Sequence, residues 1–579
     1  MRVSDHLDSA DSADQGPFQA RQLVPSQAPS LAELLEAHGG VVFSRTPSGE
    51  ELAVAGGDQR LEIRPGDVHI HSGSVKTGDL FAALPGLRVD GIRFVPDAVT
   101  RGASVVFLPA DRSVDALRRS IARAPLPLTR AATSRSASPL FWVHPRAREI
   151  VGEVAAHVHG RPADRLAMAG VTGTNGKTSV CHLAYQLLGA SGRAPAILGT
   201  AGHTLRGRTG PLHMEASHTT PDATQIQRLL ARHVAGGGDC AVMEASSHAL
   251  VQGRLSGLQL QVGAFTNLTR EHLDYHRTMG RYAEAKARLW DSVAPGGHAV
   301  IFGTDAVAND MVERAQARDL QVIRVAVEEA AKEDGDRSEG HLVASDVHLD
   351  ERGARFRMDG LGFVEQEILL PLRGAHNIEN ALVAVALAHC LGASREDLAT
   401  GLAALSAAPG RLEVVPLPGV AFDVLVDYAH SPDALERVLS ALRADMVERS
   451  SRPGSEGRLI CVFGCGGDRD RGKRGPMGRA VGELSDVAIV TSDNPRGEAP
   501  EAIADAVVAG VDEVGGRRIV ELDRARAIER ALGIARPGDV VLIAGKGHEN
   551  TQVIDGRSLP FDDRVVAAEA FARQIGGVR

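Results

Sequence analysis

The sequence predicts an α/β protein made of several domains, and three observations support that expectation. The chain has 579 residues, which at roughly 150 residues per domain indicates three or four globular units. Short apolar runs typical of buried strands alternate with helical stretches, as in sheets that helices cover. Aromatic residues make up 3% of the chain and 63 residues are glycine, so we expect aliphatic cores and tight turns.

Composition and charge exclude several classes of protein. The chain is 43% apolar and 24% charged, which fits neither wholesale disorder nor a membrane protein, and no apolar run is long enough for a membrane-spanning helix. The net charge of -9 offers no basic field to nucleic acid or to an anionic membrane. The 5 cysteines are odd in number and lie in apolar or glycine-rich runs, which favours a reducing compartment. We therefore expect a cytoplasmic protein that binds neither nucleic acid nor a membrane.

The first predicted domain covers residues 30–160, after a polar leader over residues 1–29 that we expect to be disordered. Ser30 can cap a short helix at the start of this domain. Two strand-like runs, a helix and a further strand then follow before residue 110, and they resemble a βαβ unit. A helix with its exit turn over residues 145–162 marks the boundary.

The second predicted domain covers residues 161–408. An apolar strand, a glycine-rich turn and a helix occupy residues 166–188, and further strand-like runs lie at 240–246, 262–268 and 298–303. Helical stretches separate these runs, which predicts a parallel sheet with helices on both faces. We expect a solvated loop at the acidic run 328–336 and an alanine-rich helix at 376–391.

The third predicted domain covers residues 409–579 and has the same α/β character. Each of its main apolar runs ends in a polar or glycine-rich turn, at residues 421–430, 458–467, 487–495 and 539–547. Open α/β folds bind ligands at the carboxyl edge of the sheet. We therefore expect functional groups in these turns.

The sharpest chemical signal is the glycine-rich turn before the first helix of the second domain. Its residues are Gly173, Thr174, Asn175, Gly176, Lys177, Thr178 and Ser179. Backbone N–H groups of such a loop surround phosphate oxygens, the lysine adds a charge at the terminal phosphates, and the Thr178 hydroxyl can bind Mg²⁺. The strict P-loop pattern has a glycine where this chain has Val171, and the alternative is an ordinary glycine-rich turn.

Further segments occur along the chain in the order known from one enzyme family. They are residues 219–221 (TTP), 243–248 (MEASSH), 266–276 (TNLTREHLDYH), 282–286 (YAEAK), 376–380 (HNIEN), 427–432 (DYAHSP), 464–469 (GCGGDR), 493–496 (DNPR) and 545–549 (GKGHE). With the glycine-rich turn they resemble the Mur ligase family, and within it the MurE type, from about residue 30 to the C-terminus.

The resemblance implies three α/β domains, each with one ligand. A small N-terminal domain would hold the UDP end of UDP-MurNAc-L-Ala-D-Glu, a central P-loop ATPase-like domain would hold ATP, and a Rossmann-like C-terminal domain would hold 2,6-diaminopimelate. ATP would phosphorylate the γ-carboxylate of D-Glu, and the amine of the amino acid would attack the acyl phosphate. We expect a monomer.

The resemblance also implies a catalytic set. Lys177 would face the terminal phosphates, Thr178, Glu244 and His272 would face Mg²⁺, and Lys286 would be N-carboxylated, which turns a lysine into an oxygen ligand. Without the resemblance, Lys286 would be interpreted as a solvated helix lysine.

Three further groups of residues follow from the resemblance. Near the base and ribose of ATP it implies Asn377, Asn380, Arg411 and Asp427, while the neighbouring His376 can equally be a helix cap. For the muramoyl dipeptide it implies Thr219, Thr220, Ser246, Gln252 and Arg254. For the incoming amino acid it implies Arg469, Asp493, Asn494, Pro495, Arg496, Gly545 and Glu549. The guanidinium of Arg496 can bind the distal carboxylate of diaminopimelate, which lysine lacks.

One tripeptide departs from the family pattern. Where the family has Asp-Ser-Arg, this chain has His71, Ser72 and Gly73, so only Ser72 remains for the uridine diphosphate end. One alternative is therefore a paralogue that adds another amino acid, such as L-lysine, or uses a related nucleotide. Another is a folylpolyglutamate or cyanophycin synthetase. An alternative from a different class is a P-loop switch protein driven by nucleotide turnover.

Overall fold

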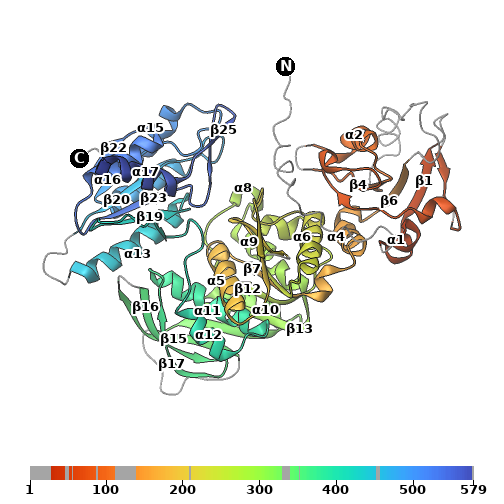
Figure 1. Cartoon of the computed structure of the whole chain (residues 1–579), viewed down its shortest axis with the longest axis horizontal. Coiled ribbons are helices and arrows are strands. Elements are labelled where there is room, and N and C mark those ends of the chain that lie inside the picture. The colour runs from red at the N-terminus through yellow and green to blue at the C-terminus, as the bar shows by residue number, and fades with distance from the viewer. Residues whose placement is uncertain are drawn as a thin grey trace.

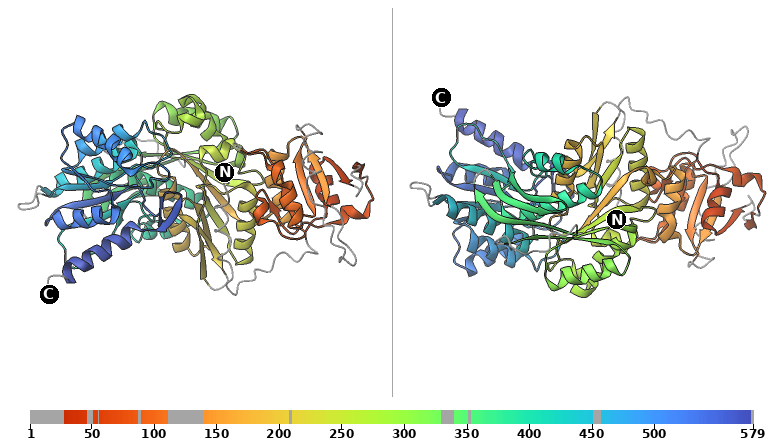
Figure 2. Two further views of the ribbon diagram at one scale, coloured as in Figure 1. Left: turned by 90° about the horizontal axis from the view of Figure 1, so that it is seen from above. Right: turned by 90° about the horizontal axis from the view of Figure 1, so that it is seen from below.

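The computed structural model of the protein describes residues 28–576 apart from 46–50, 55, 87–88, 111–138, 208–209, 329–339, 351–352 and 451–456. Three large sheets lie in a row along the longest axis of the molecule, with the N-terminal domain at one end and the C-terminal domain at the other (Figure 1, Figure 2). Nearly all of the predicted leader and of the acidic run 328–336 lies outside the described residues.

The N-terminal domain is a six-stranded sheet with helices on both faces. Its strands are β1 (Val41–Arg45), β2 (Glu51–Ala53), β3 (Val68–His69), β4 (Leu80–Ala82), β5 (Val105–Pro109) and β6 (Leu140–His144). Its helices are α1 (Leu31–His38), η1 (Gln59–Glu62), η2 (Ser72–Ser74), η3 (Gly91–Phe94), α2 (Val95–Thr100), α4 (Ala147–Val158) and η4 (Pro162–Arg165). Helices α1 and α4 pack on one face and α2 on the other.

The order of this sheet is β2-β1-β6-β5-β4-β3, and the strands from β6 to β3 are parallel. The predicted βαβ unit is β4, α2 and β5, whereas the antiparallel pair β1 and β2 was not predicted. Ser30 caps α1 as predicted, because its hydroxyl accepts the Glu33 N–H at 3.2 Å while the Glu33 carboxylate accepts the Ser30 N–H.

The central domain is an eleven-stranded sheet. Its strands are β7 (Ala167–Thr172), β8 (Pro195–Gly199), β9 (Gly202–Gly207), β10 (Gly210–Met214), β11 (Cys240–Glu244), β12 (Leu260–Phe265), β13 (Val293–Phe302), β14 (Gln321–Val327), β15 (His341–Asp350), β16 (Gly353–Gly360) and β17 (Phe363–Leu370). Its helices are α5 (Lys177–Ala190), α6 (Ala223–Ala235), α7 (Ser247–Val251), α8 (Leu273–His276), α9 (Met279–Ala287), η5 (Arg288–Ser292), α10 (Ala306–Gln316), α11 (Ala375–Cys390) and α12 (Arg395–Leu402). Helices α5, α11 and α12 cover one face, while α6, α7 and α10 cover the other.

The predicted parallel sheet with helices on both faces is present from β8 to β15, and antiparallel strands that we did not predict extend it at both edges. The order is β10-β9-β8-β11-β7-β12-β13-β14-β15-β16-β17, and the strands from β8 to β15 are parallel. Strands β9 and β10 at one edge, and β16 and β17 at the other, pair antiparallel. Antiparallel neighbours need only a short turn, so these edges form without the crossover helices from which we predicted the inner strands.

The C-terminal domain has a six-stranded sheet of order β18-β19-β23-β20-β21-β22 and a separate hairpin, β24 and β25. Its strands are β18 (Glu413–Val414), β19 (Asp423–Asp427), β20 (Leu459–Phe463), β21 (Val487–Val490), β22 (Arg518–Val520), β23 (Val540–Ala544), β24 (Thr551–Ile554) and β25 (Arg557–Pro560). Its helices are α13 (Pro432–Ser450), α14 (Arg474–Leu484), α15 (Pro500–Glu513), α16 (Arg524–Ile534) and α17 (Asp563–Gly576). Helices α13, α14 and α15 pack on one face, and α16 and α17 on the other.

Contacts at both boundaries hold the three domains together. Between the first two domains, Asp67 accepts a hydrogen bond of 2.6 Å from Nε of Arg228 on α6. Where the linker enters the third domain, Gly410 has a φ of 64° and packs directly on the loop after β23. A Cβ at Gly410 would lie 2.1 Å from the backbone nitrogen of His548, so this linker position requires glycine.

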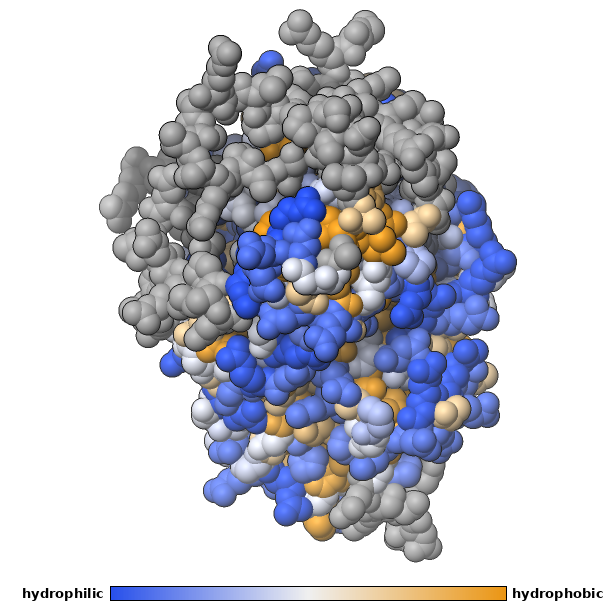
Figure 3. Space-filling view, turned by 90° about the vertical axis from the view of Figure 1, so that its right-hand side faces the viewer, coloured by the Kyte–Doolittle hydropathy of each residue, from blue (hydrophilic) through white to orange (hydrophobic). Residues whose placement is uncertain are grey.

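The described helices include none that is both long enough and apolar enough to cross a membrane. Figure 3 shows the end of the molecule that carries the N-terminal domain, where hydrophobic residues form small areas among hydrophilic ones. The 5 cysteines are free, and Cys461 and Cys465 are buried.

Candidate functional site

A cavity of about 340 Å³ lies where the carboxyl ends of central strands face the C-terminal domain. The turns after β7 and β8, the end of β11 and the end of β19 all contribute to its lining. Open α/β sheets bind ligands at this edge. The cavity therefore has the position of an active site shared by two domains.

The glycine-rich turn lies in this cavity and leads directly from β7 into α5, as predicted. Gly173 has a φ of 152°, and a Cβ there would lie 1.9 Å from the Thr266 hydroxyl. The Nζ of Lys177 donates hydrogen bonds to the carbonyls of Gly173 at 2.9 Å and of Thr174 at 2.8 Å. Burial lowers the pKa of Lys177, while the Glu244 carboxylate acts in the opposite direction. The ammonium is thus held over the loop, where a terminal phosphate would bind.

Glu244 is the buried acid of the cavity and is 1% exposed. Its Oε1 accepts the Thr178 hydroxyl at 3.0 Å and the Thr200 N–H at 2.7 Å, and its Oε2 accepts the Thr200 hydroxyl at 3.1 Å. Arg411 reaches the same point from the interdomain linker, with Nη2 at 3.3 Å from the Thr178 hydroxyl. The buried Nε of Arg411 has no hydrogen-bond partner within the described residues.

Lys286 is buried, at 1% exposure, so the interpretation as a solvated helix lysine is wrong. Its Nζ lies 4.3 Å from the centre of the Tyr282 ring, one turn earlier on α9. Among the described residues no carboxylate forms an ion pair with it. Burial lowers the pKa of Lys286 well below its ordinary value, and the charge of Lys177 adds to that effect. The Tyr282 hydroxyl lies 3.2 Å from the Thr174 hydroxyl, so the ring joins Lys286 to the phosphate loop.

His272 is the N-cap residue of α8 and has a left-handed backbone, at a φ of 55°. Strained backbone of this kind is concentrated at functional sites. Its Nε2 lies 3.7 Å from Oε2 of Glu271, and its ring contacts the ring of His248 edge-on at 4.8 Å. Burial lowers the pKa of His272, which favours a neutral imidazole that can accept a metal ion.

The residues implied for the muramoyl dipeptide form a connected group beside Glu244. The Thr220 hydroxyl lies 2.9 Å from the Glu244 carbonyl and 3.2 Å from the Ser246 hydroxyl. Arg254 donates from Nη1 to the Thr220 carbonyl at 2.6 Å, and from Nη2 to Oε1 of Gln252 at 2.8 Å.

Thr219 lies at the margin of this group, whereas Ser72, which we expected at the uridine diphosphate end, lies outside it. The Thr219 hydroxyl accepts the Thr200 hydroxyl at 3.1 Å, which brings Thr219 into the cavity. Ser72 lies in η2 of the N-terminal domain, and none of its described hydrogen bonds reaches the central domain. The structure therefore brings together the dipeptide residues of the central domain and leaves Ser72 apart from them.

The residues implied for the nucleotide base and ribose also line the cavity. Asn380 donates from Nδ2 to Oδ1 of Asn377 at 3.3 Å on the first turns of α11. Asp427 ends β19 and accepts the N–H groups of Leu412 at 2.8 Å and Ala429 at 2.7 Å. Burial raises the pKa of Asp427, and Arg411 opposes that rise.

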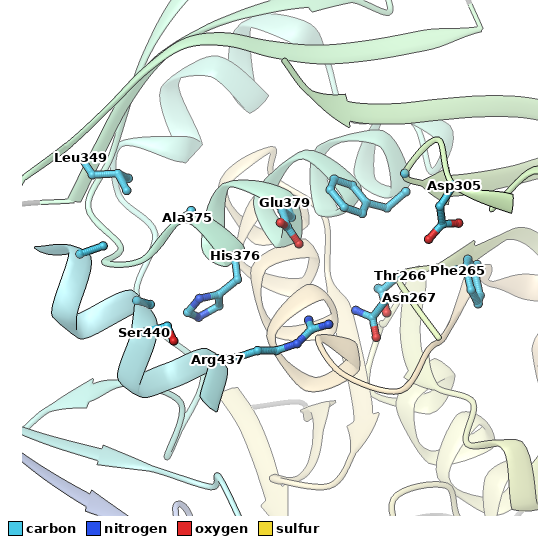
Figure 4. Close-up of a pocket in the computed structure, with 14 residues that line it drawn as sticks. Phe265, Thr266, Asn267, Asp305, Leu349, Ala375, His376, Glu379, Arg437 and Ser440 are labelled. Atoms are coloured by element: carbon cyan, nitrogen blue, oxygen red, sulfur yellow. The ribbon is translucent and has the colours of Figure 1, made fainter. Parts of the chain in front are cut away.

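The suggestion that His376 caps a helix is wrong, because the N-cap of α11 is Gly374 without a side-chain bond. Burial lowers the pKa of His376 to about 4. A second cavity of about 570 Å³ continues the site past His376, between α11 and α13. In this cavity Arg437 extends from α13 toward Asn267, beneath Glu379 (Figure 4).

The residues implied for the amino acid gather at the carboxyl ends of β21 and β23. Asn494 is 6% exposed and donates from Nδ2 to Oε2 of Glu549 at 2.9 Å. Gly545 has a φ of 116°, and a Cβ there would lie 3.9 Å from Cγ of Asp493.

Arg496 follows Pro495 with a left-handed backbone, at a φ of 55°. Its N–H donates to the Val553 carbonyl at 3.0 Å, so the hairpin of β24 and β25 holds it in place. Its Nη1 donates to the Gly467 carbonyl at 2.8 Å. Arg469 is exposed and forms none of the described hydrogen bonds, so the structure does not join it to this group.

Sequence reasoning missed several residues of the site. Glu271, Tyr282 and Lys546 lie within the motifs that carry the resemblance, and their positions inside those motifs were the available signal. Thr200 and Asp433 contact the site from other segments, and no sequence pattern marked them.

Comparisons with known proteins agree with the geometry. Family models match residues 67–158 as the Mur ligase family catalytic domain, 171–388 as the Mur ligase middle domain and 410–547 as the Mur ligase glutamate ligase domain. A relative from Gloeobacter violaceus named UDP-N-acetylmuramoyl-L-alanyl-D-glutamate–2,6-diaminopimelate ligase is 40% identical, over 91% of this chain and 98% of its own. A protein of the same name from Thermosynechococcus vestitus is 39% identical, over 88% of this chain and 93% of its own.

Solved structures give the same picture. A structure with the name of these relatives superimposes with a TM-score of 0.60 at 32% identity, over 95% of this chain and 99% of its own. A MurF from Acinetobacter baumannii shares the fold, with a TM-score of 0.57 at 18% identity, over 94% of this chain and 98% of its own. From the coverage of all three domains and the identity to these relatives, the chain belongs to the Mur ligase family.

Proposed function

We propose that this chain is an ATP-dependent ligase of the MurE type, which joins 2,6-diaminopimelate to the γ-carboxylate of D-Glu in UDP-MurNAc-L-Ala-D-Glu during peptidoglycan precursor synthesis. One observation carries the proposal: the phosphate loop, buried Glu244 and the linker residue Arg411 line a single cavity. Relatives at 37–40% identity that bear the corresponding name support the choice of substrates.

The chemistry requires activation, because a carboxylate is a poor electrophile at neutral pH. Transfer of the γ-phosphoryl group to the D-Glu carboxylate gives an acyl phosphate and ADP. The amine of the amino acid then attacks the carbonyl carbon, loses a proton, and the tetrahedral intermediate expels phosphate. We assign Lys177 and Arg411 to the phosphoryl oxygens, whose charge they neutralise as it develops.

We assign Thr178, Glu244 and His272 to Mg²⁺. The donor set fits, because the carboxylate and hydroxyl oxygens are hard ligands that already lie 3.0 Å apart. The described residues contain no group of three or more His, Cys, Asp or Glu that converges on one point, and Mg²⁺ typically takes one or two carboxylates and completes its shell with water and phosphate. When bound, the ion supplies positive charge to the phosphoryl oxygens.

We further propose that Lys286 is N-carboxylated. The supporting observation is a buried amine beside an aromatic ring with no described ion-pair partner. Addition of CO₂ to the neutral amine forms an N–C bond and releases a proton, which converts the side chain into an anion. Such a group would add oxygen ligands at a point close enough to Lys177 for the two charges to interact.

Arg496 and Asn494 are our candidates for the distal carboxylate of diaminopimelate, and Glu549 is our candidate for the distal ammonium. The alternative is that the enzyme adds L-lysine, which has no distal carboxylate and would leave the Arg496 guanidinium without an ion-pair partner. We place the enzyme in the cytoplasm as a monomer, and both statements remain predictions.

The test is ADP release by the purified chain with all substrates and with each one omitted. We expect release only when UDP-MurNAc-L-Ala-D-Glu, diaminopimelate and ATP are all present, with a UDP-linked tripeptide in the mass spectrum. Release of ADP when both UDP-MurNAc-L-Ala-D-Glu and diaminopimelate are omitted would contradict the ligase proposal and favour an ATP-driven switch.

A further inference from the structure

We infer that Lys546 is a positioning residue of the amino-acid pocket, which holds Glu549 and Asn494 ready for the charged distal end of the incoming amino acid. The inference rests on the proposed function. It concerns a residue to which neither the resemblance nor the proposed mechanism gives a role.

Lys546 is fully buried at the carboxyl end of β23, with 0% exposure. Its Nζ lies 3.1 Å from Oε2 of Glu549, 3.3 Å from Oδ1 of Asn494 and 3.8 Å from Oδ1 of Asp493. A buried ammonium is costly unless it is paired and hydrogen-bonded. Here its three polar neighbours are all residues that we assign to the pocket.

A second buried cation beneath the pocket already has its own partner. Arg524 and Asp563 are both fully buried, and the guanidinium donates from Nε and Nη2 to the two carboxylate oxygens at 2.8 Å each. This pair is neutral as a unit. Among the described residues, Lys546 is therefore the cation that lies within ion-pair distance of both Asp493 and Glu549, while Arg524 acts on these two carboxylates from farther away.

This charge balance suits one class of ligand. Two carboxylates and one ammonium leave the cluster of Asp493, Glu549 and Lys546 with a single negative charge, which matches one ligand ammonium. The carboxylate at the distal end of the ligand would bind to Arg496. We therefore expect the pocket to select a zwitterionic distal end over a simple amine.

Lys546 also fixes the orientation of the Asn494 amide. The atom of Asn494 that faces Lys546 also accepts the Val553 N–H at 2.9 Å. Both neighbours are donors, so this atom must be the oxygen. The amide nitrogen then faces Glu549, and its second hydrogen remains for a ligand carboxylate.

The experiment compares steady-state kinetics of the full-length enzyme and Lys546→Met, which removes the charge but keeps an unbranched side chain. We expect the KM for diaminopimelate to rise about 10- to 100-fold, the usual effect of losing a charged hydrogen bond. The KM for ATP and kcat at saturating diaminopimelate should change less than about 3-fold, because no phosphate-loop residue contacts Lys546.

Arg458→Met is the matched control. Arg458 donates to the buried carboxylate of Asp539 at 2.6 Å. It lies just before β20, at the amino ends of the strands, whereas Lys546 lies at their carboxyl ends. This variant also strips a cation from a buried acid, so it should lower the thermal midpoint without raising the KM for diaminopimelate. An equal rise in the KM for diaminopimelate in both variants would show that Lys546 only stabilises the fold, and it would overturn the inference.

A second comparison does not depend on Lys546→Met being stable. In the Glu549→Gln background the nearer counter-charge of Lys546 is gone, while Asp493 remains at 3.8 Å. Adding Lys546→Met should then raise the KM for diaminopimelate by a smaller factor than in the wild type, or by less than about 3-fold where the single variant does not fold. A full 10-fold or larger rise in that background would contradict the inference. Failure of the wild type to use diaminopimelate at all would instead contradict the proposed function.

Discussion

Asn175 in the phosphate loop donates a hydrogen bond of 2.9 Å from Nδ2 to Oδ2 of Asp433, which lies at the start of α13 in the C-terminal domain. The same carboxylate oxygen accepts the Thr269 hydroxyl at 3.1 Å. The glycine-rich turn that we assign to ATP is therefore linked to the C-terminal domain through this acidic side chain. Nucleotide binding and placement of the C-terminal domain should depend on each other.

Asp433→Ala removes this link. We expect the KM for ATP to rise about 3- to 10-fold, because two hydrogen bonds to a partly exposed carboxylate are lost. Steady-state ADP release measures the change. Glu436→Ala on the same helix is the control, since Glu436 is exposed and forms none of the described contacts with the loop. An unchanged KM for ATP in Asp433→Ala would show that the hydrogen bonds to Asp433 contribute nothing to ATP binding.

Lys177→Ala should abolish ligation. The loop has no other cationic side chain, and loss of one electrostatic contact of this kind typically reduces the rate about 10²- to 10³-fold. Product formation followed by mass spectrometry, together with an unchanged thermal midpoint, provides the measurement. Turnover near the wild-type level would remove the basis for assigning this turn to ATP.

Lys286→Ala should be nearly inactive, and short carboxylic acids should partly restore its activity by filling the space of the missing carbamate. The physical reason is that the variant loses an anion in a buried position. Lys76→Ala is the control, because Lys76 is exposed on the N-terminal domain. An intact-mass measurement and electron density that both show a bare amine at Lys286 in the nucleotide complex would refute the carbamate.

Arg496→Ala should lose the preference for diaminopimelate over L-lysine. A site built to pair a carboxylate leaves buried donors unsatisfied when lysine enters, which allows discrimination of about 10⁴-fold without editing. The ratio of kcat/KM for the two amino acids, in wild type and variant, measures it. Equal use of both amino acids by the wild type would favour the L-lysine alternative.

Asp67 should make stability depend on pH in the acid range. Burial alone would raise the pKa of Asp67, but His159, Arg228 and His69 together hold it well below its ordinary value. The resulting stabilisation is complete above the unfolded pKa of about 4, begins to fall below it, and is lost progressively as the pH drops through the lower folded pKa. Urea unfolding from pH 6 to pH 3 should therefore show a difference between wild type and Asp67→Asn that shrinks toward pH 3. A constant difference would show that Asp67 does not titrate in this way.

Sequence reasoning captured the inner strands because each is a continuous apolar run followed by a polar turn. β19, β20, β21 and β23 all follow that rule, as does the passage from β7 into α5. The edge strands β16 and β17 were missed because exposed and buried residues are mixed in them. Their pairing depends on a neighbour in space, which local sequence does not specify.

The candidate site divides in a similar way. Phosphate-loop chemistry follows from residue types at fixed spacing, so Lys177 and Thr178 could be named directly. Burial of Lys286 could not, because an alanine and a charged residue on either side make its helix look solvated. Thr200 and Asp433 belong to the site only through long-range packing, since each bonds a residue far away in the chain.

The close approach of Gly410 to the loop after β23 has a consequence for recombining members of this family. A chimera that exchanges the C-terminal domain to obtain a new amino-acid specificity would have its natural joint in the linker between the two sheets. A cut placed after Gly410 would pair the linker of one parent with the 545–549 loop of the other, across a contact that tolerates no Cβ. Productive crossovers should therefore fall before Pro409, so that linker and loop are inherited from the same parent.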